Sequence, residues 1–534
     1  MKNIKIDARL YFFGIVSLIF FVFAYQKIMF FPAHSIHSWR QADCLSLSAN
    51  FIDNHNPFKP EIHNYISDDK TSGKSAGEFT GMYYLIGKIW SIFGIKIWIF
   101  RFVNYILLIS ACYSLFKVLQ RYLNSIFWSL IVSLFVLISP LIVYYAPNFL
   151  TDITALSFTI FGWSFFLQYL EKKDNKKFYS MLILFALAAL FKITSAVSLL
   201  SIGGVLFLEF VGFFKTEKSY FNKNKKLLIY FLLSLFAICI WYIYAEYYNK
   251  IHGGKYTFNS LWPLWSLDKL HYNNAIKFFT EITVYQLYNK IVLFVLIVLT
   301  FSAFYISFTK DKRVFTLLLL TILGYTCYIV FWFGALENHD YYFINLFTLP
   351  IIILGINIYY LLLIKRNSGL EKIIKCIAIC LFILSVFYSA SNIRLRYAEK
   401  LSVGKVLSER FFDKNQILFW KWISSTQRDR GLFSMEKYNR KLGIKKTDLI
   451  ICYPDFTFNY SLFYLNQKGW TTFNNPSYQS KPINEMIQRG AKFLIINKKE
   501  VTNSYQNGLK ELQPFMNDSI GYHKGYTIYK LANN

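Results

Sequence analysis

Long apolar runs alternate with short polar connections as far as about residue 391, and this pattern predicts membrane-spanning helices. Eleven runs are long enough, or nearly long enough, to cross a bilayer. They cover about 10–32, 100–118, 126–146, 150–170, 178–191, 195–214, 227–247, 288–308, 314–333, 342–364 and 373–391. The pattern therefore predicts a polytopic α-helical membrane protein with about 11 transmembrane helices.

The composition agrees with a membrane protein. Of the 534 residues, 55% are hydrophobic and only 16% are charged, which is less charge than a soluble chain of this length carries. The seven cysteines show neither a disulfide framework nor zinc-ligand spacing. The net charge of +28 is compatible with nucleic-acid binding, but basic residues gather in the loops between apolar runs. We therefore expect membrane lipids, and no nucleic acid, as partners.

The basic loops predict the orientation of the chain. They are "EKKDNKK" (171–177), "KTEKSYFNKNKK" (215–226), "KDKR" (310–313) and "KRNSGLEK" (365–372). The positive-inside rule places all four, and the N-terminal "MKNIKIDAR", in the cytoplasm. No small-residue cleavage site follows the first apolar run, so we expect a retained helix. These features predict a multi-pass protein of a cytoplasmic membrane with its N-terminus inside, and the high usage of Lys, Ile, Asn and Phe suggests a bacterial source.

The stretch 79–99 is apolar enough to span, but a span there would place all four basic loops outside. We therefore predict a helix lying at the interface over about 79–97. The polar segments 33–80, 248–287 and 334–341 then face outward, together with the C-terminal region.

The character of the chain changes near residue 393, where the long apolar runs end. Strand-like stretches follow: "DLIICYP" (448–454), "KFLIIN" (492–497) and "YTIYKL" (526–531). A helical pattern at 483–490 precedes the second of these. We predict a transmembrane module over 1–392, with a first outer loop at 33–80 and interfacial helices to about 99, and an extracytoplasmic α/β domain over 393–534.

The first outer loop begins with "HSWRQADCLSLSANF" (37–51), in which Trp39, Asp43 and Leu47 share one helical face. Arg40 lies about one turn from Asp43. This predicts either a surface helix that presents an acid or an interfacial anchor helix with an Arg40–Asp43 pair. Glu78, in "GKSAGEFTG", is either a helix-start residue favoured by the helix dipole or a functional acid.

Three further outer positions carry polar chemistry. Asp152 in "PNFLTDITA" is either an N-cap or a functional acid at the mouth of a span. Lys192 in "LFKITS" is either a snorkelling anchor or an anion-binding residue with a phosphate as its ligand. His339, Asp340, Tyr341 and Tyr342 in "ENHDYYFINLF" form a cluster more polar than an aromatic belt requires.

The chain contains no P-loop, no Rossmann glycine pattern and no Ser/His hydrolase motif. The outer acids, the lysine and the His–Tyr cluster instead suit an anionic lipid and a polar acceptor. A carboxylate would deprotonate an acceptor hydroxyl or amine. Cations would stabilise a phosphate leaving group.

The order and sidedness of these segments resemble those of a known family. The segments are "WRQAD", Glu78, an interfacial helix ending in Gly, "RFVNYIL", Asp152, "FKIT" and "NHDYYFINLFTLP". They resemble the GT-C membrane glycosyltransferases of the protein O-mannosyltransferase and lipid A aminoarabinose transferase group (glycosyltransferase family 39 type), over about residues 1–390. The resemblance implies a polyprenyl-phosphate sugar donor and inverting transfer to a lipid, glycan or protein acceptor outside the membrane.

The resemblance also implies roles for single residues. Asp43 matches the catalytic base, and Glu78 matches an acid that shapes the site or binds a metal ion. Cys44 stands where several members have a second acid, so one expected metal ligand is missing. A divalent metal ion is thus a candidate cofactor whose ligands are unknown. "FTG" after Glu78 replaces the Lys-Pro of the aminoarabinose enzymes.

The remaining candidates are implied to bind the donor phosphate or substrate. They are Arg40, Asp152, Lys192, His339, Tyr341 and Tyr342. Two other functions stay open. A polysaccharide polymerase or ligase would use the same donor-phosphate site to transfer a chain. A lipid transporter or flippase would more typically show inverted repeats and broken helices, which the sequence does not display.

Overall fold

The computed structural model forms two compact units. Unit 1 comprises Met1–Phe31, Trp98–Trp241 and Ser260–Trp422, and unit 2 comprises Pro32–Ile97, Tyr242–Asn259 and Ile423–Asn534. This division differs from a single boundary near residue 393, because the first outer loop clusters with the C-terminal α/β region. The structure describes residues 7–66, 73–214, 219–222, 224–254, 261–363, 368–398, 401, 414–426, 431–498 and 503–532.

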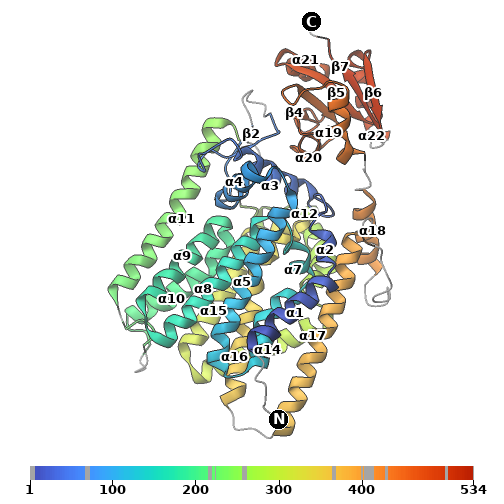
Figure 1. Cartoon of the computed structure of the whole chain (residues 1–534). Helices are drawn as coiled ribbons and strands as arrows, with labels where there is room; N and C mark the ends of the chain where they lie inside the picture. The colour runs from blue at the N-terminus through green and yellow to red at the C-terminus, as the bar shows by residue number, and fades with distance from the viewer. Residues whose placement is uncertain are drawn as a thin grey trace. The chain divides into compact units, whose positions relative to one another are not determined.

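Unit 1 is helical (Figure 1). The last turns of α11, the first residue of α5 and the last four residues of α18 belong to unit 2. The elements are α1 (Ala8–Val22), α2 (Tyr25–Ile28), α5 (Ile97–Leu123), α6 (Ile126–Leu134), η1 (Phe135–Ile138), α7 (Pro140–Tyr145), α8 (Thr151–Lys172), α9 (Asn175–Phe191), η2 (Ile193–Ser195), α10 (Ala196–Phe210), α11 (Lys225–His252), η3 (Leu264–Ser266), α12 (Lys269–Phe278), η4 (Phe279–Thr283), α13 (Val284–Leu287), α14 (Lys290–Lys310), α15 (Lys312–Phe331), η5 (Phe333–Glu337), η6 (Asp340–Phe347), α16 (Thr348–Leu363), α17 (Ser368–Arg396) and α18 (Lys414–Thr426).

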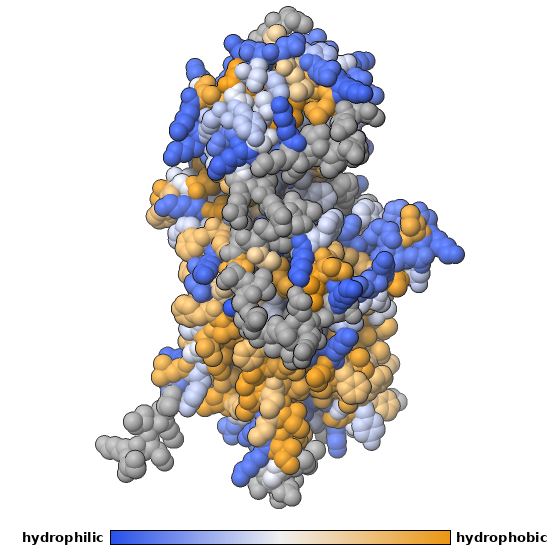
Figure 2. Space-filling view, turned by 90° about the vertical axis from the view of Figure 1, so that its right-hand side faces the viewer, coloured by the Kyte–Doolittle hydropathy of each residue, from blue (hydrophilic) through white to orange (hydrophobic). Residues whose placement is uncertain are grey.

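Eight helical segments of the described chain are long and apolar enough to cross a membrane. Two shorter apolar helices, Ala8–Val22 and Ile126–Ile138, accompany them. All eleven predicted runs are largely helical, but the exact count of 11 spans stays a prediction. On the face shown in Figure 2, hydrophobic side chains form a broad belt. This belt suits a hydrocarbon environment, since isolated apolar residues would not give a continuous band.

The predicted single helix over 126–146 is wrong, because it is divided among α6, η1 and α7. Pro140 occupies the first position of α7, where its missing N–H costs no hydrogen bond. The Ser139 side chain accepts from the Ile142 N–H at 3.5 Å and so caps the new helix. A proline inside one continuous helix would have removed a hydrogen bond.

Unit 2 combines short helices with a mixed sheet. Its elements are α3 (Ser38–Asn50), β1 (Glu61–Ile62), β2 (Gly73–Lys74), α4 (Gly81–Phe93), α19 (Leu432–Lys441), β3 (Leu449–Tyr453), α20 (Tyr460–Leu465), β4 (Gly469–Thr471), α21 (Ser480–Gln488), β5 (Ala491–Asn497), α22 (Asn503–Leu512), η8 (Gln513–Phe515), β6 (Ser519–His523) and β7 (Tyr526–Lys530).

The five-stranded sheet has the order β4-β3-β5-β7-β6. Strand β3 runs parallel to β4 and β5, and β7 runs antiparallel to β5 and β6. Alternate residues of β3 face opposite sides, as strand geometry requires. Ile450 packs with α19 and α20, whereas Ile451 packs with α21 and α22. The region is therefore an α/β sandwich with one core on each face of the sheet.

The first outer loop is attached to the edge of this sheet. Tyr65 forms a parallel bridge with Gly469 of β4. The Asn64 side-chain amide donates to the Gln467 carbonyl at 3.0 Å. Lys468 forms an ion pair with Glu61 at 3.2 Å. These contacts explain why a loop near the N-terminus and a C-terminal sheet make one compact unit.

Candidate functional site

Asp43 is a buried acid in the middle of α3. Its side chain lies among the buried positions that run from Gln41 to Asn50, and the residue is only 4% exposed. Its Oδ1 atom has no hydrogen-bond partner among the described residues. Trp39 on the same predicted face is 40% exposed, whereas Leu47 is buried. A buried carboxyl oxygen without a hydrogen-bond partner costs free energy. Packing alone therefore does not explain an aspartate at this position.

The position of α3 is fixed by its neighbours within unit 2. Helix α4 packs closely at Gly87, where a methyl group would overlap the Ser48 carbonyl oxygen and Phe51. Helix α20 holds the chain that leads into α3, because the Tyr464 hydroxyl accepts from the Ala33 N–H at 2.6 Å. The backbone that carries Asp43 is therefore held by both the first loop and the C-terminal region.

Arg40 pairs with Glu78, so the predicted Arg40–Asp43 pair is wrong. Arg40 and Glu78 form a partly buried ion pair. The Tyr83 hydroxyl donates to the same Glu78 carboxylate at 2.7 Å and lies 3.4 Å from the Cys44 sulfur. Helical spacing favours Asp43 as the partner of Arg40, because the two residues are three positions apart. Glu78 instead lies 38 residues after Arg40 in the chain. We name Arg40, Asp43, Cys44, Glu78 and Tyr83 the Asp43 cluster.

The surroundings of Asp43 favour its protonated form. Burial raises the pKa of Asp43 to about 8, the positive charge of Arg40 opposes this rise, and the negative charges of Asp455 and Glu78 add to it. Burial also raises the pKa of the neighbouring Cys44 thiol to about 12. A carboxyl group whose pKa lies near neutral pH is suited to general acid–base chemistry.

The Asp43 cluster does not fit a metal site. Within the described residues, no group of three or more His, Cys, Asp and Glu side chains is arranged to hold a metal ion. The Glu78 carboxylate is engaged by Arg40 and Tyr83. Cys44, at the position of the missing acid, is a buried neutral thiol. We therefore derive no step through a metal ion.

Asp152 lies in the first turn of α8, inside the helix. The N-cap position belongs to Leu150, so an N-cap role for Asp152 is wrong. The Asp152 carboxylate instead forms an ion pair with Lys192 at 3.1 Å, and both side chains are largely buried. A negative charge in the first turn is also favoured by the helix dipole.

Lys192 lies between this carboxylate and two aromatic rings. Its ammonium nitrogen is 5.1 Å from the centre of the Tyr341 ring and 4.6 Å from that of Tyr342. His339 makes edge contacts with both rings, at centroid distances of 5.5 Å and 5.8 Å. Lysine over an aromatic face is attracted by the ring electrons. We name Asp152, Lys192, His339, Tyr341 and Tyr342 the Lys192 cluster.

Asn345, which the sequence analysis missed, joins the two segments of this cluster. Its side-chain oxygen accepts from Ser195 at 2.8 Å, and its amide nitrogen donates to Thr194 at 3.0 Å. These hydrogen bonds fix the turn after Lys192 to η6, which carries the tyrosines. The signal available in the sequence was an asparagine within the otherwise apolar "YFINLF".

Asp340 belonged to the predicted polar cluster, but its ion pair with Arg396 was missed by the sequence analysis. Their ion pair, at 3.1 Å, has zero solvent exposure on both side chains. The Tyr145 hydroxyl donates to the same carboxylate at 2.6 Å. The Arg396 guanidinium also lies 4.0 Å from the centre of the Trp420 ring. Because Asp340 stands between His339 and Tyr341, this ion pair fixes the backbone of the Lys192 cluster.

The structure thus gathers the eight predicted site residues into two clusters. Arg40, Asp43 and Glu78 lie in unit 2, and the other five lie in unit 1. The first cluster offers a buried acid that can exchange a proton. The second offers a cation held by a carboxylate and aromatic faces, which can contact an anionic group.

Comparison with known families gives one match along the sequence. A family model described as dolichyl-phosphate-mannose-protein mannosyltransferase matches residues 80–244. This stretch begins two residues after Glu78 and includes Asp152 and Lys192. A search of curated proteins finds no match to the sequence.

Comparison with solved structures shows a shared fold over nearly the whole chain. ArnT from Cupriavidus metallidurans in the apo state is 10% identical, with 98% of each chain covered and a TM-score of 0.57. The same protein bound to undecaprenyl phosphate is 11% identical, with 96% of this chain and 97% of that chain covered and a TM-score of 0.53.

An oligosaccharyltransferase from Archaeoglobus fulgidus, tethered with an acceptor peptide, shares the same fold. It is 10% identical, with 98% of this chain and 74% of that chain covered and a TM-score of 0.50. At sequence identities this low, the comparison shows a likeness of fold alone. The family-model match and the shared fold confirm that this chain resembles the GT-C membrane glycosyltransferases.

Proposed function

We propose that the protein is an inverting glycosyltransferase that moves a sugar from a polyprenyl-phosphate donor to an acceptor on the outer face of the cytoplasmic membrane. The observation that carries this proposal is the buried Asp43 with an unsatisfied carboxylate oxygen. The fold likeness to ArnT bound to undecaprenyl phosphate supports a lipid-phosphate donor. The likeness to an oligosaccharyltransferase tethered with a peptide supports a polar acceptor.

The proposed step is a single displacement. The Asp43 carboxylate accepts the proton of an acceptor hydroxyl or amine, and the acceptor oxygen or nitrogen bonds to the anomeric carbon of the sugar. The bond between that carbon and the phosphate oxygen breaks, and its electron pair leaves with the polyprenyl phosphate. Because the acceptor attacks from the face opposite the leaving group, the anomeric configuration inverts. Asp43 later loses its proton to water.

Lys192 is assigned to the leaving phosphate. Its ammonium group is held by Asp152 and two tyrosine rings, so its position is fixed before a ligand arrives. A pre-positioned cation stabilises the charge that develops on a leaving phosphate more effectively than a mobile one. Asp152 is therefore a positioning residue, and the His339 ring packs against the same tyrosine rings.

Substituting Lys192 with methionine should weaken binding of polyprenyl phosphate by ~10- to 150-fold, since one charge-assisted contact contributes about 1.5–3 kcal/mol. Binding is measured with the purified protein and a fluorescent polyprenyl phosphate. Lys290→Met is the matched control, because Lys290 is an exposed residue of unit 1 at the start of α14. Equal affinities for wild type and Lys192→Met would remove Lys192 from the phosphate site.

The rate of transfer should rise with pH up to about 8, because the base must be deprotonated and burial raises the pKa of Asp43 to about 8. Below this value the rate should fall with the fraction of ionised Asp43. Asp455→Asn removes one of the neighbouring negative charges that raise the pKa of Asp43. This variant should shift the rise in rate to lower pH.

The control for the pH experiment is Asp518→Asn, which removes an exposed acid of the same unit. Its profile of transfer rate against pH should match that of the wild type. Arg40 and Glu78 remain unchanged in both variants, so the other charges that act on Asp43 are constant. An identical shift in both variants would mean that net charge, and not Asp455, sets the profile.

Transfer of a lipid-linked oligosaccharide is the second candidate function. It is supported by the fold likeness to the Archaeoglobus fulgidus oligosaccharyltransferase. The two candidates differ in the mass added to the acceptor. Mass spectrometry of the product distinguishes one sugar from a chain.

A further inference from the structure

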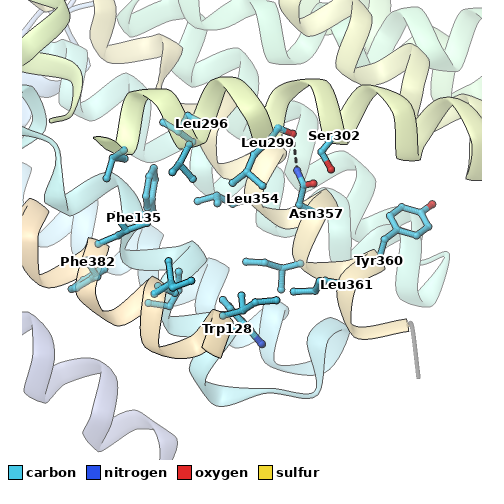
Figure 3. A pocket seen from close by; sticks show the side chains of 18 of the residues that line it. Trp128, Phe135, Leu296, Leu299, Ser302, Leu354, Asn357, Tyr360, Leu361 and Phe382 are labelled. Atoms are coloured by element: carbon cyan, nitrogen blue, oxygen red, sulfur yellow. Dashed lines mark hydrogen bonds between the residues drawn. The ribbon is translucent and has the colours of Figure 1, made fainter. Parts of the chain in front are cut away.

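An apolar groove lies among α6, α14, α16 and α17 of unit 1 (Figure 3). Its volume is about 660 Å³, which is within the ~300–1,000 Å³ of cavities that hold small ligands. Aliphatic and aromatic side chains such as Leu296, Leu354 and Phe382 make up almost all of its lining. Within the described chain, this lining and the two clusters share no residue. The groove is therefore separate from the Asp43 cluster and from the Lys192 cluster.

The groove is long enough to hold a lipid chain. Its lining along α14 extends from Val292 to Lys310. At 1.5 Å per residue these positions are ~27 Å apart, close to the ~30 Å thickness of the hydrocarbon core. An acyl chain from one leaflet therefore fits lengthwise.

Polar contacts join the surrounding helices beside one end of the groove. The Ser389 hydroxyl donates to the Ile138 carbonyl at 2.6 Å, and Asn289 donates to Ser385 at 2.9 Å. These bonds hold the C-terminal half of α17 against the start of α14 and η1. The other half of α17 contributes apolar positions, among them Ala378 and the exposed Ile377.

The surroundings of the groove are expected to be lipid. Only 17% of the apolar stretch of α14, and 22% of that of α17, is buried inside the protein. The Asn357 amide in the lining is satisfied, since it donates to the Leu299 carbonyl (Figure 3) and to the Ile353 carbonyl, both at 2.9 Å. An apolar space that opens toward hydrocarbon is filled by acyl chains more readily than by water.

One end of the groove carries an exposed charge. Lys310, the last residue of α14, is exposed and belongs to the lining. The adjacent acid, Asp311, is engaged by the Tyr220 hydroxyl at 2.8 Å and by the Arg313 N–H at 2.9 Å. The predicted topology places this end at the cytoplasmic surface, where anionic lipids attract basic residues.

We propose that this groove binds an anionic phospholipid, with one acyl chain along α14 and its phosphate at Lys310. The apolar lining selects a lipid tail, and the Lys310 amine at the predicted cytoplasmic end selects a negative headgroup. This site is independent of the transfer reaction, because it uses none of the residues assigned to that reaction.

The test measures which lipids stay bound. Wild-type protein is reconstituted with equal amounts of phosphatidylglycerol and phosphatidylcholine, extracted in mild detergent and analysed by mass spectrometry. Phosphatidylglycerol should be retained in excess. Lys310→Gln should lower its retention ~5-fold, the factor that corresponds to the about 1 kcal/mol of one basic residue near an anionic surface.

Matched variants make this test specific. Lys312→Gln removes an exposed lysine that does not line the groove and should retain the wild-type amount. Ala378→Trp and, from the facing helix, Ser302→Phe fill the groove and should lose both lipids. Equal retention of the two lipids by wild type would overturn the proposal. So would lipid retention by both groove-filling variants, equal losses in Lys310→Gln and Lys312→Gln, or displacement of phosphatidylglycerol by added polyprenyl phosphate.

Discussion

Substituting Asp43 with asparagine is expected to lower sugar transfer by ~10²–10⁴-fold, the range that a general base contributes. Asparagine has nearly the same shape, so α3 should keep its contacts with α4 and α20. It cannot accept the proton of the acceptor, so the displacement loses its base. Transfer is measured as labelled product per minute from a polyprenyl-phosphate sugar, with saturating acceptor.

The structure also predicts what this variant leaves unchanged. A neutral amide avoids the cost of an ionised carboxylate at a buried position, so the apparent melting temperature should stay equal or rise. The affinity for polyprenyl phosphate should also stay equal, because Lys192 is intact. Asp53→Asn, at an exposed acid of the same loop, is the control and should retain full transfer. Wild-type transfer by Asp43→Asn would exclude Asp43 as the base.

Removing one partner of the Asp340–Arg396 ion pair is expected to destabilise unit 1 by about 3–5 kcal/mol. Both side chains have zero exposure, so either single variant leaves a charge that water cannot reach. Asp340→Asn also weakens the hydrogen bond from Tyr145. Arg396→Met removes the contact between the guanidinium and Trp420. The apparent melting temperature in detergent, followed by tryptophan fluorescence, checks the loss.

A double variant distinguishes charge burial from packing. Asp340→Leu combined with Arg396→Met removes both charges and should recover part of the stability lost in each single variant. The control is Glu371→Gln, because the Glu371–Lys375 pair lies on the same helix with both side chains about one-third exposed. This change should cost about 0–1 kcal/mol. Equal melting temperatures for all the variants would contradict a structural role for the buried pair.

Sequence patterns predicted the elements whose signal is local. Most of the apolar runs became single helices because each carries its own hydrophobic signal, whereas the run at 126–146 was divided. The stretches at 448–454, 492–497 and 526–531 became β3, β5 and β7, because β-branched and aromatic residues mark them. The helix over 79–97 is α4 with narrower bounds, and it ends before Gly94, whose φ of 74° suits glycine.

Two strands were missed because their local pattern is weak. Strand β4 has three residues, and β6 includes a glycine, so neither carries a strong strand pattern.

The other features that were missed depend on contacts between residues distant in sequence. Helical spacing paired Arg40 with Asp43, yet Glu78 is the ion-pair partner. Residue type favoured Asp152 as an N-cap, yet Lys192 binds its carboxylate. The attachment of the first loop to β4 likewise joins segments about 400 residues apart, which local propensity does not reveal.

The most direct test of the proposed function uses purified protein in lipid bilayers with a mixture of radiolabelled polyprenyl-phosphate sugars. The measured quantity is free polyprenyl phosphate released in the presence of acceptor. The wild type should release it, and Asp43→Asn should release little or none while still binding the donor. If neither protein releases it although bound donor lipid is recovered from both, the glycosyltransferase proposal is contradicted and a lipid transporter is favoured.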